Sequence, residues 1–249
     1  MLLRRVIKHV KEQNWTAVGL DFLIVVVGVF IGIQVANWNE SRQESATRQL
    51  MHERLVKDFE RIKQQSDDAV KRIEKILASL ITLQRTVRRG RVSADEKAQV
   101  VYALEFGFSY PAINQRSDTY VELLSSGRLD LIDNEHLRVA LLAYDQRVQQ
   151  SRFNETQINE YLSDNVSLVA FGRYREFAPP VRNENGEYER GPIRSFDIAG
   201  MTKDAEFREQ LDRMIENRTW LVSNVYHHRR AVDKVLTVLS GRPIDDEAL

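Results

Sequence analysis

The chain has 249 residues with 36 basic and 36 acidic side chains, so its total charge gives no reason to expect a nucleic acid or an acidic partner. It contains no cysteine, which excludes disulfides, thiolate metal sites and cysteine nucleophiles. Only 11 glycines and 5 prolines interrupt a sequence rich in helix-forming residues, so the composition favours long helices.

Residues 1–15 combine apolar and basic side chains at helical spacing. The two kinds would lie on opposite faces of a helix, an arrangement typical of helices that lie on a membrane surface. We therefore predict that residues 1–15 form a cytoplasmic amphipathic segment. The apolar positions are Leu3, Val6, Ile7 and Val10, and the basic positions are Arg4, Arg5, Lys8 and Lys11.

Residues 16–38 are predicted to form a transmembrane helix. The stretch from Ala17 to Ala36 reads AVGLDFLIVVVGVFIGIQVA, and about 20 mainly apolar residues allow a helix to cross a bilayer. Trp15 and Trp38 flank it, as aromatic residues do at membrane interfaces. The alternative of a buried helix in a soluble core is disfavoured because residues 22–33 have no polar face. A cleaved signal peptide is disfavoured because the apolar region is too long.

The distribution of basic residues predicts the orientation of this span. Four basic residues lie within the first 11 positions, whereas Arg42, Arg48 and Arg54 are diluted by nearby glutamates. Because basic flanks stay in the cytoplasm, we expect a cytoplasmic N-terminus and an anchor in the bacterial inner membrane. Residues 39–243 would then form an extracytoplasmic helical domain, periplasmic or extracellular, followed by an acidic tail over residues 244–249.

Two features lie inside the span. Gly28, Gly32 and Ala36 recur every four residues, which predicts a helix-packing face, although glycine is also common in membrane helices. Asp21 lies about one turn inside the apolar run, where a charge is costly unless it reaches headgroups, is paired or is protonated. The helix dipole favours a carboxylate at this end, and the functional alternative is a proton or ion relay.

A single long helix is predicted to continue from the span to residue 89. Residues 40–89 include no proline or glycine, and their apolar side chains recur at alternating spacings of three and four. These positions are Leu55, Phe59, Ile62, Ala69, Ile73, Ile76, Leu80, Leu83 and Val87, with Ser66 as the polar exception, and Val56, Val70, Leu77 and Ile81 widen the stripe. Such a wide stripe suits packing against more than one neighbouring helix.

Shorter elements are expected next. Gly90 should end the long helix, and Ser93 with Glu96 is typical of a capping box for a second helix to about Phe106. A short helix capped by Ser117 or Asp118 should end at Gly127, where a left-handed residue is favoured.

Two further long helices complete the predicted domain. One should begin at Asp133 or Asn134 and run to about Tyr174, and the last should span residues 203–240; residues 177–200 form a loop in which Asn185-Gly186 turns a small hairpin. The fold class is therefore all-α, with the transmembrane helix continuing into a long helix of an elongated antiparallel bundle. The core positions are Leu137, Leu141, Tyr144, Val148, Ile158, Leu162 and Val169, then Phe207, Leu211, Met214, Leu221, Val225, Val232, Val235 and Leu239.

The densest charge cluster is formed by Arg85, Arg88, Arg89 and Arg91, at the end of the first long helix. Cations there complement the helix dipole in a solvated tip. The functional interpretation is a patch for an anionic partner, such as a cell-wall polymer, a lipid headgroup or an acidic protein.

Other candidate residues are interpreted as structural. His227 and His228, with Asp233 nearby, are neighbours on a helix and point about 100° apart, so one should face the bundle and the other water instead of sharing a metal ion. Ser125 and Ser126 precede a glycine at a helix end, where hydroxyls satisfy free carbonyls. The aromatic residues Tyr102, Phe106, Phe108 and Tyr110 are expected in the core. No Gly-rich phosphate loop, HExxH, GxSxG or acidic calcium loop occurs, so we predict no enzyme, cofactor or metal site.

Two segments, IGIQVANWNE (Ile31–Glu40) and SDTYVELLSSGRLDLIDNEHLRVALLAY (Ser117–Tyr144), together resemble a family of uncharacterised bacterial single-pass membrane proteins. That family has an acidic residue before an aliphatic span ending in Asn-Trp-Asn-Glu, and Asp21 and residues 37–40 stand at those places. Its Leu-x-Ser-Ser-Gly stretch, followed by an Asn and a leucine-rich helix, is matched by Leu123, Ser125, Ser126, Gly127, Asn134 and Leu137. The resemblance covers the anchor and about half of the domain, and it implies topology but no biochemical activity.

These observations predict a membrane-anchored structural or interaction protein of the bacterial cell envelope. Its partners would be the lipid bilayer and either a second copy of the chain or another envelope protein, and not a nucleic acid. The alternative is an accessory subunit of an ion-driven transport or motor complex that uses Asp21 in the span. A sensor that passes ligand capture through the continuous helix is a third hypothesis.

Overall fold

The computed structural model describes residues 15–109, 115–165 and 171–242, and within these ranges the side chains other than those of residues 15–18, 158–159 and 161–165. The described chain is mostly helical and divides into two compact units, Met1–Met51 and His52–Leu249. The predicted amphipathic segment, apart from Trp15, and the acidic tail lie outside the described residues, as do Tyr110 and Val169.

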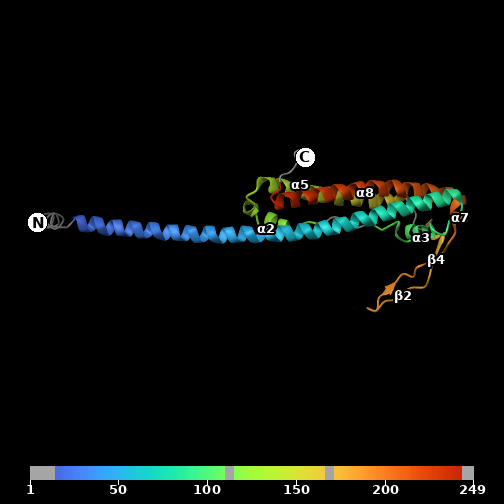
Figure 1. Ribbon diagram of the computed structural model, residues 1–249, viewed down its shortest axis with the longest axis horizontal. Coiled ribbons are helices and arrows are strands. Elements are labelled where there is room, and N and C mark those ends of the chain that lie inside the picture. The colour runs from blue at the N-terminus through green and yellow to red at the C-terminus, as the bar shows by residue number, and fades with distance from the viewer. Residues whose placement is uncertain (1–14, 110–114, 166–170, 243–249) are drawn as a thin grey trace. The chain divides into compact units, whose positions relative to one another are not determined.

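Helix α2 runs without interruption from Trp15 to Arg89, which confirms the prediction of one continuous helix (Figure 1). Residues 40–89 contain neither proline nor glycine, so nothing in the sequence breaks the ladder of backbone hydrogen bonds. Gly90 ends the helix with φ +74, and its N–H donates to the Thr86 carbonyl at 2.9 Å. This left-handed geometry favours glycine and closes the last turn.

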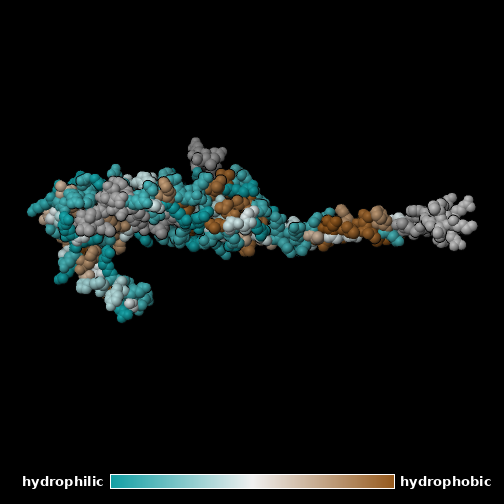
Figure 2. All heavy atoms as spheres, turned by 180° about the vertical axis from the view of Figure 1, so that it is seen from behind, coloured by the Kyte–Doolittle hydropathy of each residue, from teal (hydrophilic) through white to brown (hydrophobic). Residues whose placement is uncertain are grey.

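The N-terminal part of α2 exposes its apolar side chains. From Leu20 to Trp38 the large hydrophobic side chains are between 45% and 70% exposed. They form a continuous hydrophobic band, coloured brown in Figure 2. This stretch is long and apolar enough to cross a membrane, and none of it is buried against the described protein. It is therefore not the core helix of this fold.

Within the second unit, α2 packs antiparallel to α8 (Ala205–Leu239), and α5 (Glu135–Asn165) also packs against α8 (Figure 1). Side-chain contacts between α2 and α8 fix the direction, because residue numbers rise along one helix as they fall along the other. The hydrogen-bonded pairs are Lys63–Asp233 (2.5 Å), Glu74–Tyr226 (2.6 Å) and Gln84–Asp212 (2.6 Å). The predicted all-α antiparallel bundle is confirmed.

The predicted apolar stripes form the core. Every position predicted on α2 is buried, including Ser66, and so are the predicted positions on α8 and those on α5 up to Val148. Of the residues expected to widen the α2 stripe, Val70 is buried, whereas Ile81 is 39% exposed. Complete burial of one aliphatic or aromatic side chain contributes about 1.5–3 kcal/mol, so these stripes are the main source of stability.

Helix α3 (Lys97–Phe106) begins later than the predicted capping box implies. The hydroxyl and backbone N–H of Ser93 donate to the Glu96 carboxylate at 2.6 and 3.2 Å, so half of the box is present. The Glu96 N–H, however, donates to the Ser93 carbonyl at 3.2 Å. Residues 93–96 therefore form a turn, and the helix begins after it.

Helix α4 (Asp118–Ser125) is capped by Ser117, whose hydroxyl accepts from the Tyr120 N–H at 3.1 Å. Gly127 follows with φ +70, as predicted for the helix end. A 3-10 turn, η1 (Leu129–Leu131), leads into α5. The Asn134 side chain accepts from the Leu137 N–H at 3.3 Å, so Asn134 is the cap of α5.

The predicted loop before the last helix contains two small antiparallel sheets. Strand β2 (Val181–Arg182) pairs with β3 (Tyr188–Glu189), which confirms the hairpin expected at Asn185-Gly186. Strand β1 (Arg175–Phe177) pairs with β4 (Ile193–Phe196), a pairing that the sequence did not suggest. Tyr174, the expected end of the preceding helix, lies in the turn just before β1.

The predicted last helix, residues 203–240, is confirmed as α8, and a short helix that was not predicted precedes it. A short helix, α7 (Ile198–Lys203), is capped by Asp197, which accepts from the Gly200 N–H at 2.9 Å. Asp204 then caps α8 by accepting from the Phe207 N–H at 3.1 Å. Successive acidic caps therefore begin two helices, of which the first lies at the end of the predicted loop and the second is the predicted last helix.

Candidate functional site

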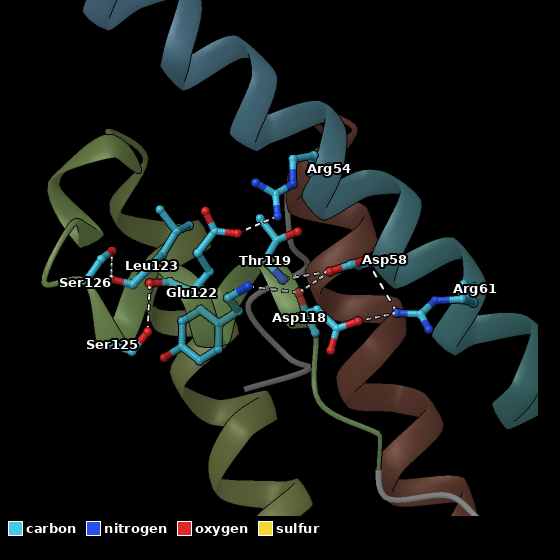
Figure 3. Close-up of polar contacts among 11 residues, drawn as sticks. Arg54, Asp58, Arg61, Asp118, Thr119, Glu122, Leu123, Ser125 and Ser126 are labelled. Atoms are coloured by element: carbon cyan, nitrogen blue, oxygen red, sulfur yellow. Dashed lines mark hydrogen bonds and ion pairs between the residues drawn. The ribbon is translucent and has the colours of Figure 1, made fainter.

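The start of α4 docks on α2 through Asp58 (Figure 3). The Asp58 carboxylate accepts from the Ser117 hydroxyl at 2.8 Å and from the Thr119 backbone N–H at 3.0 Å. Ser117 at the same time caps α4 through the Tyr120 N–H. A carboxylate of one helix thus satisfies the free N-terminal donors of another.

Ion pairs extend this α2–α4 contact along the surface (Figure 3). Arg61 lies 3.5 Å from Asp58 and 3.2 Å from Asp118, and Arg54 pairs with Glu122 one turn further along α4. These partners are largely exposed, apart from Asp58, so solvent screening leaves each surface pair only a small contribution to stability. Their arrangement fixes the direction of α4 on α2 more than it stabilises the fold.

The ionisation of Asp58 shows which interaction dominates in this contact. Burial alone would raise the pKa of its carboxyl, but the hydrogen bonds from Thr119 and Ser117, together with the charge of Arg61, outweigh burial and lower the pKa. The contact therefore holds the charged carboxylate.

A more deeply buried carboxylate, that of Asp145, lies on α5. Asp145 is 4% exposed and accepts from Arg116 at 2.6 Å and from Gln149 at 2.8 Å. The neighbouring Tyr144 hydroxyl donates to the Gln115 carbonyl. The chain just before α4 is therefore held to α5 by a charged and a neutral hydrogen bond.

A layer of polar side chains crosses the core between α2, α5 and α8. His228 is fully buried, and its Nδ1 lies 3.3 Å from the Ser66 hydroxyl, which itself donates to the Ile62 carbonyl. The Tyr144 ring lies 5.6 Å from the imidazole, and Arg147 donates to Asn224 at 3.0 Å. Burial, followed by the nearby charge of Arg147, lowers the pKa of His228 from 6.5 to about 4.

The structure separates the two neighbouring histidines as predicted: His228 faces the core, whereas His227 is exposed. Asp233 pairs with Lys63 instead of approaching either imidazole. No group of three or more potential metal ligands occurs among the described residues.

Arg218 is a buried cation that the sequence pattern did not reveal. It is fully buried on the apolar face of α8, and its Nε and Nη2 both donate to the Gly107 carbonyl, at 3.0 and 2.7 Å. Gly107 lies at the C-terminal end of α3, where helix carbonyls lack partners within the helix. Only the long-range approach of α3 and α8 gives this arginine its acceptor.

The arginine patch at the end of α2 is partly neutralised by the chain itself. Arg88 lies 3.4 Å from Asp212, and Arg89 pairs with Glu96. The hydrogen bonds from Ser93, followed by that from Arg89, lower the pKa of Glu96 to about 2. Arg85 and Arg91 remain exposed, so the outward charge is smaller than the sequence implied.

The remaining predicted residues have structural surroundings. The hydroxyls of Ser125 and Ser126 donate to the Glu122 and Leu123 carbonyls at 3.1 and 3.3 Å, as expected at a helix end (Figure 3). Tyr102 and Phe108 pack against the main core, as expected. Phe106, in contrast, is not part of the core: its side chain is 38% exposed. The centroid of its ring lies 4.7 Å from that of Tyr102.

The candidate residues of the span lie on an exposed helix. Asp21, Gly28, Gly32 and Ala36 are all exposed. A Cβ atom built on Gly28 or Gly32 would meet nothing within 4 Å, so this face is open for packing against another helix.

In comparisons with known proteins, no family model, curated protein or solved structure matches the chain. The polar contacts described above hold helices together, and the titratable groups among them are engaged by neighbouring helices.

Proposed function

We propose that the chain is a membrane-anchored structural or interaction protein of the bacterial cell envelope. The observation that supports this proposal most is the exposed apolar band from Leu20 to Trp38, which occupies the same continuous helix as the core stripe of the bundle. A band of this size is costly in water and favourable in a bilayer. The helix then links an anchor to a folded domain without an intervening linker.

The orientation follows from charge. Basic residues concentrate before the span, so the N-terminus belongs in the cytoplasm and the bundle on the other side of the inner membrane. The resemblance to bacterial single-pass proteins supports the same topology. In this position the bundle presents helical surfaces to other envelope components.

The absence of cysteine makes the topology directly testable. A single cysteine replacing the exposed Ser126 should react with a membrane-impermeant maleimide in intact spheroplasts, whereas one replacing Lys11 should react only after lysis. The full-length protein should also stay in the membrane pellet after alkaline carbonate washing. Recovery in the soluble fraction, or the reverse labelling pattern, would refute the proposal.

A second copy of the chain is the partner that the span supports best. Gly28, Gly32 and Ala36 form an open face of small residues, and such faces let two helices approach closely in lipid. Cross-linking in native membranes should recover a dimer or a larger homo-oligomer. Recovery of monomer alone, at several cross-linker lengths, would exclude self-association and leave another envelope protein as the partner to be sought.

A further inference from the structure

The polar layer at the junction of α2, α5 and α8 contains His228, whose surroundings do not stabilise a protonated imidazole. Nε2 of His228 has no hydrogen-bond partner among the described residues, and its Nδ1 has only the Ser66 hydroxyl, at 3.3 Å. The ring is one of three that join the helices, since Phe59 on α2 packs edge-on against Tyr144 on α5 at 4.8 Å, and Tyr144 faces His228.

Among the residues that the structure describes, no charged group around His228 serves it as a counter-ion. On α2, the flanking Lys63 and Asp67 pair with Asp233 and Arg229 of α8 instead. On α5, the Asp145 carboxylate is paired with Arg116, and burial raises the pKa of the Tyr144 hydroxyl, which keeps it neutral. The charged side chain that acts on the imidazole is Arg147, a cation. A proton on His228 would therefore place a second positive charge beside the first in a buried layer.

We propose that His228 is an acid-sensitive switch in the bundle: protonation of its imidazole against Arg147 loosens the packing of α8 on α2 and α5. The neutral ring completes the row of aromatic contacts, whereas the charged ring needs water or a carboxylate that the closed bundle does not supply. The junction between α2, α5 and α8 therefore has to open before water can solvate the protonated imidazole.

The direction of the pH dependence follows from linkage. The pKa of His228 is 6.5 in a solvated state and about 4 in the closed bundle, so below pH 6.5 the open state binds the proton more strongly. The closed state is unaffected above that pH, loses stability as the pH falls from 6.5 towards 4, and loses nothing further from this group below 4. The full interval corresponds to a loss of roughly 100- to 300-fold in the ratio of closed to open protein.

The physiological meaning of the switch rests on the proposed function. An extracytoplasmic domain is exposed to the acidity of the surroundings, and α8 packs on the same helix that carries the anchor. Acid would then loosen the surface that the envelope protein presents to its partner. The physical switch itself does not depend on topology, so the two proposals can fail separately.

The test compares full-length protein in detergent micelles, unfolded by chemical denaturant and followed by far-UV circular dichroism at several pH values between 7 and 4. His228→Leu should lose most of the pH dependence between 6.5 and 4. His227→Gln is the matched control, because it removes the adjacent but exposed histidine, and it should keep the wild-type dependence. The quantity compared between variants is the slope of the free energy of unfolding against pH. A loss of stability that is the same at every pH does not change this slope.

A second variant tests the role of Arg147. Arg147→Met removes the neighbouring charge, so the pKa of His228 should rise and the acid penalty should become smaller than in the wild type. If the His228 variants do not fold, the titration of His228 is followed in the wild type by NMR with labelled histidine. A midpoint near 4 supports the switch. A midpoint near 6.5, or an unchanged slope in His228→Leu, overturns it.

Discussion

The carboxylate of Asp58 on α2 accepts a hydrogen bond at 2.8 Å from the hydroxyl of Ser117, the residue that caps α4. Ser117 is thus an acceptor for its own helix and a donor to another. The two hydrogen bonds of the Ser117 hydroxyl fix where α4 begins and where it packs on α2. Residues 117–119 therefore have a structural role in the bundle.

Replacement of Asp58 by Asn should weaken this junction. Ser117 and Thr119 donate to the same carboxylate oxygen, so the amide oxygen can still accept from both, but as a neutral and weaker acceptor. The amide NH2 would then replace the oxygen that faces Arg61. We expect a loss of about 1–3 kcal/mol in the free energy of unfolding, measured with urea. Asp118→Asn is the control. It changes an exposed carboxylate in the same contact, and its cost should stay below about 1 kcal/mol.

The Asp58 contribution should also depend on pH. The pKa of the folded carboxyl lies below its ordinary value of 3.8, so its stabilising effect is complete above pH 3.8 and is lost as the pH falls below it. The difference between wild type and Asp58→Asn should therefore shrink only in strong acid. A difference that already disappears between pH 6.5 and 4 would contradict the described hydrogen bonds.

The Arg116–Asp145 pair should show unequal costs for its two partners. The Asp145 side chain is 6% exposed and that of Arg116 is 28% exposed. Arg116→Met leaves a buried carboxylate with Gln149 as its remaining side-chain donor, and should cost about 3 kcal/mol. Asp145→Leu leaves an arginine that can reach water and should cost less. The double variant should be more stable than Arg116→Met alone, and denaturation of all four proteins completes the cycle.

The sequence predicted the helices and caps that depend on residues close to one another along the chain. Helix α2 and the core faces of α2 and α8 follow from apolar spacing, and the caps Ser117 and Asn134 from side chains that compete for helix N–H groups. Arg218 could not be predicted as a core residue. An arginine in an apolar stripe normally indicates the edge of a buried face, and its acceptor, the Gly107 carbonyl, is 111 residues away. The β1–β4 pairing was missed because such short strands carry no usable periodicity.

Gly107 should be sensitive to the addition of a single methyl group. A Cβ at this position would lie 2.5 Å from the Ala103 carbonyl oxygen and 2.6 Å from the Met214 side chain, beside the carbonyl that receives Arg218. Gly107→Ala should cost about 1–3 kcal/mol, measured by urea unfolding. Gly172→Ala is the matched control, because a Cβ there meets nothing within 4 Å. Equal stability of the two variants would show that the α3–α8 contact is looser than described.

Self-association through the span should depend on the face that carries Gly28 and Gly32. A large side chain at either position would project from the helix where a second helix backbone needs close approach, so Gly28→Ile and Gly32→Ile should reduce the cross-linked dimer several-fold in native membranes. Gly19→Ile is the matched control: its Cβ also meets nothing within 4 Å, but it lies outside the four-residue repeat. All three variants keep the apolar span and should stay in the membrane fraction. A dimer fraction that is unchanged in both repeat variants would move the contact away from this face and onto the bundle.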